Sequence, residues 1–276
     1  MQPGSVETRI HDAMHRLTAA EKRVARGLLA NYPTIGFAPV AEFSGQAGAS
    51  PATVLRFVAQ LGFGSYPEFQ RALRQELEER VKSPLQRGMA SPPRPERDEN
   101  FLDRFVSQAV DNLRTSAGRI PSSEFEAVCS RLADARGSCH LLGGRFTDAI
   151  AAYLEAHLRL IRPGVRRLDG RSSSRTDQLL DVRAGDVAVV FDVRRYDPQL
   201  VDVAASLAAR RVFVVLITDA WISPVSRYAK IVLPCETAMD RTWDANVALF
   251  AAVEAIIART TELCWNSASK RIGSIE

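Results

Sequence analysis

The chain has 276 residues, of which 46% are hydrophobic and 25% are charged, a composition typical of a globular protein with one or two domains. This composition excludes collagen, a coiled-coil rod and a disordered tail. The net charge of +4 lies in residues 1–97, which contain 13 basic and nine acidic residues, whereas residues 98–276 contain 23 of each. Local positive charge favours a polyanionic partner for the N-terminal part.

The four cysteines have no paired spacing, and no apolar run approaches the 18 residues of a membrane-spanning helix. The first residues also lack the basic start and apolar stretch of a secretion signal. We therefore expect a reduced cytoplasmic protein that is not inserted in a membrane.

The first 82 residues show only helical periodicity, which predicts an all-α domain of about five short helices. The segment from Thr18 to Glu21 reads TAAE, a capping box that predicts the start of the second helix. Ser50 followed by Pro51 is typical of an N-cap and a first helical position, and Gly62 predicts the end of that helix. The last predicted helix runs over 66–81, with Phe69, Leu73 and Leu77 on its apolar face.

Helices predicted over 39–46 and 51–61 are separated by a turn at 47–49, the arrangement of a DNA-binding helix-turn-helix. The alternative for two such short helices is a plain helical bundle. We expect an inner seam formed by Val40, Phe43, Ala47, Val54, Leu55, Val58 and Leu61. The exposed start of the second helix then presents four candidate DNA-binding residues: Ser50, Ala52, Thr53 and Arg56.

Residues 17–77 resemble the N-terminal domain of the RpiR (MurR/RpiR) transcription regulators. The match is in register from LTAAEKRVA through SPATVLRF to LGFGSYPEF. The resemblance implies a winged or extended helix-turn-helix in which Ser50, Thr53 and Arg56 contact double-stranded operator DNA.

Residues 83–98 contain four prolines and no apolar periodicity, so they predict a linker before a second domain over 99–265. This second part alternates helices and Val-rich apolar runs, such as VAVVF and VFVVLIT, which are typical of strands covered on both faces. The prediction is a doubly wound α/β fold with about five parallel strands, and the ligand site is considered for the strand order 2-1-3-4-5. The tail over 266–276 is polar, and we expect it to be frayed.

In such a sheet, ligands bind at the carboxyl ends of the strands where the strand order reverses. The loops at that point lie at 143–147 and 192–197 and contain three arginines, which favours a phosphate or carboxylate ligand. The alternative is a structural ion network among these arginines, Asp192 and Asp197.

Residues 138–257 are similar to a sugar isomerase (SIS) domain, the usual partner of the RpiR reader. The first sugar-phosphate motif of such domains, G-x-G-x-S, is matched by Gly143 and Thr147, but Arg145 replaces the second glycine. The second motif is absent from 191–197, which contains no hydroxyl or glycine at the expected places. The resemblance therefore implies either a different anionic effector or none. The candidate ligand-binding residues are Gly143, Gly144, Arg145, Thr147, Ser173, Asp192, Arg194, Arg195 and Asp197.

Isomerases with this fold need a general base, for which the candidates are His140, His157, Glu155 and Glu236. None of these has a neighbour in sequence that would tune its pKa. His11 and His15 lack a third metal ligand, and no nucleophile elbow or phosphate-binding loop is present. We therefore expect neither catalysis nor a metal or cofactor.

The sequence as a whole predicts a DNA-binding regulator whose second domain senses a small anionic effector and forms a homodimer or homotetramer. Two alternatives stay open. One is a sugar-phosphate isomerase with a helical extension, and the other is a ligand-free DNA-binding dimer.

Overall fold

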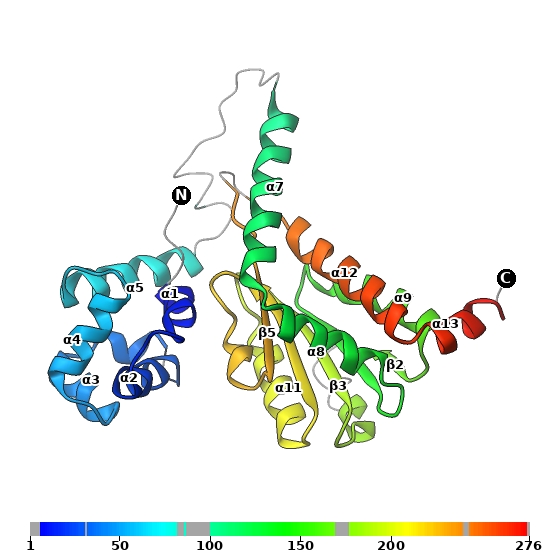
Figure 1. Cartoon of the computed structure of the whole chain (residues 1–276), viewed down its shortest axis with the longest axis horizontal. Helices are drawn as coiled ribbons and strands as arrows, with labels where there is room; N and C mark the ends of the chain where they lie inside the picture. Colours follow the sequence, from blue (N-terminus) through cyan, green and yellow to red (C-terminus); the bar gives the residue numbers. More distant parts are fainter. Residues whose placement is uncertain are drawn as a thin grey trace. The chain divides into compact units, whose positions relative to one another are not determined.

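The structure is a computed structural model that describes residues 6–30, 32–81, 86, 100–168, 177–239 and 243–274. The chain forms two compact units, which divide between Ser83 and Pro84 (Figure 1). Most of the predicted linker and the whole of 169–176, including Ser173, lie outside the described residues.

The first unit is helical, as the periodicity predicts. Its elements are α1 (Val6–Ala13), α2 (Ala19–Ala30), the short 3-10 helix η1 (Thr34–Phe37), α3 (Val40–Gln46), α4 (Pro51–Gln60) and α5 (Tyr66–Val81). The capping box forms at the start of α2, where the Thr18 backbone N–H donates to Glu21 Oε2 at 2.9 Å. The Glu21 backbone N–H donates in return to Thr18 Oγ1 at 3.3 Å, so two free N–H groups of the helix start are satisfied.

The buried face of α5 differs from the predicted one at Leu77. Phe69 and Leu73 are fully buried, but Leu77 is exposed, and the buried position in that turn belongs to Glu76. Glu76 accepts hydrogen bonds from the Tyr32 hydroxyl at 2.7 Å and from the Val6 backbone N–H at 2.8 Å. The carboxylate therefore ties α5 to α1, and hydropathy alone could not reveal that a charged residue takes a core position.

The second unit alternates helices with five short strands. The helices before and between the first strands are α7 (Phe101–Arg119), α8 (Ser122–Ala133), α9 (Asp148–Ile161) and the 3-10 helix η2 (Leu179–Asp181). The later ones are α11 (Pro198–Ala209), the 3-10 helix η3 (Pro224–Arg227), α12 (Val247–Leu263) and α13 (Trp265–Ile272). The strands are β1 (Cys139–Gly143), β2 (Val165–Arg167), β3 (Val187–Asp192), β4 (Phe213–Asp219) and β5 (Ile231–Cys235).

The strands form one parallel sheet in the order β2-β1-β3-β4-β5, which confirms the predicted fold class and has the strand order assumed in locating the ligand loops. Gly143 pairs with Phe191, and Asp192 pairs with Thr218. The carboxyl ends of β1, β3 and β4 therefore lie side by side, and the loops that follow them meet at one edge of the sheet.

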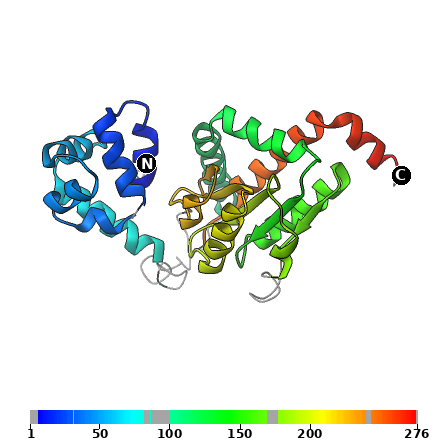
Figure 2. The ribbon, with the colours of Figure 1, turned by 90° about the horizontal axis from the view of Figure 1, so that it is seen from below.

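Successive residues of β3 and β4 alternate between two hydrophobic cores, one on each face of the sheet. In β3, Val187, Val189 and Phe191 pack with residues of α8, α9 and α12, whereas Ala188 and Val190 pack with residues of α11. Figure 2 shows the helices on the two sides of the sheet. Burial on both faces explains why these strands are continuous apolar runs in the sequence.

The C-terminal end differs from the prediction. Helix α12 ends at Leu263 and is followed by a further helix. The tail expected to be frayed forms α13, with Ala268 fully buried in the core cluster that includes α9. The Arg271 guanidinium also donates to the Arg159 carbonyl at 2.9 Å. One small buried residue and one side-chain hydrogen bond do not produce a hydrophobic periodicity, so the sequence pattern could not predict α13.

Candidate functional site

The pair of helices α3 and α4 has the turn predicted from the sequence. Gly48 adopts a left-handed conformation with φ of +59°, and the Ala49 backbone N–H donates to the Ser44 carbonyl at 3.0 Å. Ser50 is the N-cap of α4, because its hydroxyl accepts a hydrogen bond from the Thr53 backbone N–H at 3.2 Å. Pro51 takes the first helical position, where a missing N–H is tolerated.

The inner face of α4 is formed by Val54, Phe57, Val58 and, after the helix end, Leu61. These positions follow the spacing of three and four residues that one helix face requires. Leu55, predicted to lie in this seam, is 47% exposed, so that prediction is wrong. Leu55 lies between two seam positions, and its apolar character alone does not determine which way it faces.

The exposed side of the N-terminal part of α4, together with its N-cap, carries three of the four candidate DNA-binding residues. Ser50, Ala52 and Arg56 are exposed, but Thr53 is only 5% exposed, which contradicts its predicted place on the exposed face. The Thr53 hydroxyl lies 2.8 Å from the Ser50 hydroxyl and 3.5 Å from Arg56 Nη2. Thr53 therefore holds the two flanking polar side chains in place.

The loop after β1 is fixed by glycine and by one hydroxyl. A Cβ atom added at Gly143 would lie 2.3 Å from the backbone N of Asp148, so only glycine allows the strand end to approach the start of α9. The Thr147 hydroxyl donates to the Phe191 carbonyl at 2.7 Å and accepts from the Gly144 backbone N–H at 2.8 Å. Gly143 and Thr147 thus join β1, α9 and β3, and the hydroxyl already has two partners.

Asp192, at the end of β3, is almost completely buried. Its carboxylate accepts hydrogen bonds from the Ser223 hydroxyl at 2.5 Å and from the Asp197 backbone N–H at 3.3 Å. Burial raises the pKa of Asp192 to about 7, since desolvation outweighs these hydrogen bonds. The Asp197 side chain caps α11 by accepting from the Gln199 backbone N–H at 2.9 Å.

A second buried carboxylate, that of Asp219 at the end of β4, organises the loop after β3. It accepts hydrogen bonds from the Arg194 backbone N–H at 2.6 Å and from the Tyr196 hydroxyl at 2.7 Å. The Arg194 side chain is nearly buried, with Nε 3.6 Å from Asp244 Oδ2. Of the three arginines predicted to hold a ligand, Arg194 is therefore engaged within the protein.

The other two arginines, Arg145 and Arg195, are exposed and lie over aromatic rings that no sequence motif marks. The guanidinium carbon of Arg145 is 5.3 Å from the centre of the Phe146 ring. That of Arg195 is 5.5 Å from the same ring and 6.0 Å from the Trp243 ring. Trp243 is about 100 residues distant in the chain, so no local pattern could have joined it to this loop.

The two histidines considered as general bases are engaged elsewhere. His140 Nε2 lies 3.0 Å from Asp186 Oδ2 in a buried pair near the amino ends of β1 and β3. His157 Nδ1 lies 3.0 Å from the Tyr153 carbonyl, within the same helix. Neither ring is placed among the loops at the carboxyl ends of the strands.

The two glutamates considered as general bases are paired with arginines. Glu155 lies 3.4 Å from Arg167 Nε and 3.7 Å from Arg159 Nη1. Glu236 lies 2.9 Å from Arg119 Nη1. Both carboxylates are therefore held beside guanidinium groups of the same unit.

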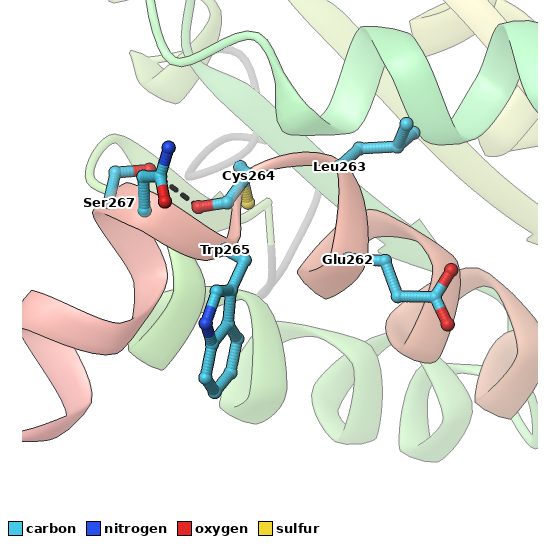
Figure 3. A pocket seen from close by; sticks show the side chains of 6 residues that line it. Glu262, Leu263, Cys264, Trp265 and Ser267 are labelled. Carbon is cyan, nitrogen blue, oxygen red and sulfur yellow. Dashed lines mark hydrogen bonds between the residues drawn. The ribbon is translucent and has the colours of Figure 1, made fainter.

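Two open cavities of about 270 Å³ each lie outside the loops just described or at their margin. One is at the joint of α12 and α13, around Cys264, and is lined by a single continuous segment (Figure 3). There the side chains of Leu263 and Trp265 point in different directions, and the Ser267 hydroxyl donates a hydrogen bond to the Cys264 carbonyl. The second cavity is lined by Tyr196, Pro198 and other residues around the start of α11.

Within the described residues, no group of three or more His, Cys, Asp or Glu side chains is arranged to hold a metal ion. His15 lies in an exposed turn after α1. The helices of the described part include none that is both long and apolar enough to cross a bilayer.

Comparison with protein families identifies both units. The model of the helix-turn-helix domain of the rpiR family matches residues 4–80, and the SIS domain model matches residues 131–259. The chain belongs to the RpiR family. It is an RpiR-family transcription regulator that joins a helix-turn-helix domain to a SIS domain.

Solved structures share the fold of this RpiR-family chain. The sugar isomerase domain of an RpiR transcription factor from Sphaerobacter thermophilus is 23% identical, with a TM-score of 0.57, and the match covers 64% of this chain and 98% of that domain. The NanR protein of Vibrio vulnificus, complexed with ManNAc-6P, is 16% identical with a TM-score of 0.54, over 98% of this chain and 96% of NanR.

An enzyme has a similar fold in its matched part. A phosphoheptose isomerase from Francisella tularensis is 13% identical, with a TM-score of 0.52, over 60% of this chain and 100% of the enzyme. No match was found among curated protein sequences. The SIS fold thus occurs both in regulators and in isomerases, and fold alone does not choose between them.

Proposed function

We propose that this regulator binds operator DNA through the exposed N-terminal part of α4 and its N-cap, with Ser50, Ala52 and Arg56 as the contacting residues. The observation that carries the proposal is the exposed Arg56 on a helix that is N-capped by Ser50 and introduced by a glycine turn. Arginine at such a place reaches either a phosphate or a guanine edge in the major groove. The excess of basic residues in 1–97 supports the same partner.

The experiment is fluorescence anisotropy with labelled DNA from the promoter region of the protein's own gene. Binding that exceeds binding to scrambled DNA of the same length, at one fixed salt concentration, supports the proposal. Equal affinity for both DNAs at every salt concentration contradicts specific operator recognition.

A DNA-binding role places the protein in the cytoplasm.

The second part of the proposal is that the SIS domain senses a small anionic effector. The loops after β1 and β3 meet at the carboxyl edge of the sheet, where Arg145 and Arg195 are exposed. NanR of Vibrio vulnificus, which shares this fold, is complexed with ManNAc-6P, and this supports a small anionic effector for the present chain. Thermal-shift screening with sugar phosphates, sugar acids and dicarboxylates tests the proposal, since a ligand of the native state raises the unfolding temperature.

The third part is that a second copy of the chain covers an apolar surface of the SIS unit. Phe101, Leu102 and Val106 are exposed on α7, which extends past the sheet in Figure 1. Val247 and Phe250 are exposed on the neighbouring α12. Symmetric operators are read by pairs of helix-turn-helix units, so a dimer or tetramer fits the DNA-binding role.

Two alternatives remain distinguishable. An isomerase would turn over an aldose or ketose phosphate, but the four candidate bases are engaged in ion pairs or hydrogen bonds. We therefore propose that the protein is not an enzyme, and turnover by the purified protein would contradict this. A ligand-free DNA-binding dimer would show no stabilisation by any member of the thermal-shift screen.

A further inference from the structure

Three separate segments of the SIS unit bring two arginines and two aromatic rings together. Arg145 and Phe146 follow β1, Arg195 follows β3, and Trp243 precedes α12. The Phe146 and Trp243 rings meet edge to face with centres 6.0 Å apart, and the Arg195 guanidinium lies within 6.0 Å of both. We call this group of four residues the aromatic-arginine cluster.

The cluster is unusual because its aromatic rings face solvent. Phe146 is 46% exposed and Trp243 is 58% exposed, although rings of this size usually contribute to a core. Arg195 adopts a φ of +67°, a left-handed conformation that costs free energy in a residue other than glycine. Strain of this kind tends to be retained where a side chain must be held in one place for function.

Beneath the cluster, the usual donors for a sugar phosphate are already in use. The Gly144 backbone N–H donates to Thr147 Oγ1, the Thr147 hydroxyl donates to the Phe191 carbonyl, and the Arg194 backbone N–H donates to Asp219. A phosphate at this level would compete with these bonds.

Charge also disfavours an anion at that level. The buried carboxylate of Asp219 lies at the end of β4, and like charges repel. The exposed guanidinium groups of Arg145 and Arg195 therefore mark the place for an anion, above the strand ends and beside the two rings.

We propose that the aromatic-arginine cluster binds a planar anion, a flat unsaturated ring that carries a carboxylate or a phosphate. The ring stacks on Trp243 or Phe146, and the anionic group accepts hydrogen bonds from Arg145 and Arg195. A sugar phosphate satisfies only the second half of this arrangement. The proposal rests on the effector-sensing role of the SIS domain and specifies the chemical class of its effector.

Calorimetric titration of the full chain tests the proposal with two matched pairs of probes. Benzoate and cyclohexanecarboxylate carry the same charge but differ in the flatness of the ring. AMP and ribose 5-phosphate share the sugar phosphate but differ in the presence of the base. We expect the planar member to bind at least tenfold more tightly in one pair or both, and the pair that responds identifies carboxylate or phosphate as the anionic group. The proposal is overturned if neither planar member binds more tightly than its partner.

Variants of exposed residues then locate the site. We expect Trp243→Ala and Arg195→Ala each to weaken binding of the planar anion about tenfold, because the first removes a stacking surface and the second removes a hydrogen-bond donor to the anionic group. Trp265→Ala is the matched control, because Trp265 has the same 58% exposure but lies in α13. Arg136→Ala is the control for charge, since Arg136 is exposed beside Asp134 and outside these loops. Equal losses in the controls would overturn the assignment.

The result is independent of the DNA-binding part of the proposed function. Anisotropy with promoter DNA measures DNA binding by α4, whereas calorimetry without DNA measures ligand binding by the aromatic-arginine cluster. If the chain binds promoter DNA and a sugar phosphate but no planar anion, only the present inference fails. If it binds a planar anion but no DNA, the inference stands and the DNA-binding role fails.

Discussion

The hydroxyl groups of Ser50 and Thr53 lie 2.8 Å apart at the first turn of α4, one exposed and the other buried. Ser50 also accepts a hydrogen bond from the Thr53 backbone N–H, so the same contact that begins the helix orders its solvent-facing side. We therefore expect the two residues to contribute to DNA binding in different ways, Ser50 by facing the DNA and Thr53 by positioning its neighbours.

Substitutions of Ser50 separate helix stability from DNA binding. Ser50→Ala removes the N-cap, and we expect the helix-turn-helix unit to lose about 1 kcal/mol of unfolding free energy. Ser50→Asp retains a good cap and should leave stability near that of the parent protein, while its negative charge weakens binding to the phosphates. Chemical denaturation and anisotropy measure the two effects. Unchanged DNA affinity in Ser50→Asp would argue against the proposed DNA-facing side of α4.

Substitutions of Arg56 separate base contact from phosphate contact. We expect Arg56→Ala to weaken operator binding by about 1–3 kcal/mol. If the guanidinium reads a base, Arg56→Lys should lose discrimination between operator and scrambled DNA but keep most of its salt dependence. Anisotropy at several salt concentrations measures both quantities. Arg136→Ala, at an exposed site of the other unit, should bind like the parent protein, and an equal loss there would show a general charge effect.

The buried Asp192 predicts a pH dependence for the stability of the SIS unit. Its pKa is raised by burial from 3.8 to about 7 in the folded protein, so the folded state binds the proton more tightly than the unfolded state does. The stabilisation is present below pH 3.8 and is lost as the pH rises towards 7. Between these values we expect the unfolding free energy contributed by this group to fall with pH, by a few kcal/mol in total.

Thermal unfolding at several pH values between 5 and 8 measures this effect. Asp192→Asn removes the titration, so the slope of stability against pH should flatten in that variant. Asp202→Asn changes an exposed carboxylate on α11 and should retain the parent slope. A parent-like slope in Asp192→Asn would contradict the prediction.

Two glycines of the SIS unit should respond to alanine in opposite directions. Gly143→Ala places a Cβ 2.3 Å from the Asp148 backbone N, so the start of α9 must shift and the unit should be strongly destabilised. At Gly118 in α7, an added Cβ meets nothing within 4 Å, and alanine should stabilise the helix by up to about 1 kcal/mol. Thermal unfolding compares the two variants. A mild effect at Gly143 would show that the strand end tolerates separation from α9.

The exposed apolar surface of α7 predicts the effect of a charge on oligomerisation. Leu102→Glu should reduce the molar mass measured by light scattering, because burying a carboxylate in an interface is costly. Leu180→Glu is the matched control, since Leu180 is also highly exposed but lies in η2. If Leu102→Glu leaves the mass unchanged while the parent protein is oligomeric, the interface lies elsewhere.

Features that depend on local chemistry were predictable from the sequence. The capping box at Thr18, the N-cap at Ser50 and the glycine turn at Gly48 each depend on neighbours within a few residues. The strands could be predicted because burial on both faces requires continuous apolar residues. Their parallel direction followed from the alternation of strands and helices.

Features that depend on distant partners were not predictable. Thr53 and Leu55 have side chains compatible with either side of α4, and the packing of α3 and α2 decides that Thr53 is buried and Leu55 exposed. The same holds for Glu76, whose core position depends on Tyr32 and on the backbone of Val6. A hydropathy pattern does not show which distant residues will lie beside a side chain, so it cannot predict these positions.

The sequence by itself determined the two-part organisation, the helix-turn-helix and the parallel sheet, because these follow from periodicity and from turn and cap residues. The tertiary structure alone decided how the loops at the carboxyl edge of the sheet are used. It buries Asp192 and engages Arg194, and it brings Trp243 to Phe146 and Arg195. These relationships arise because parallel strands end side by side, so residues about 100 positions apart in the chain become neighbours only when the sheet forms.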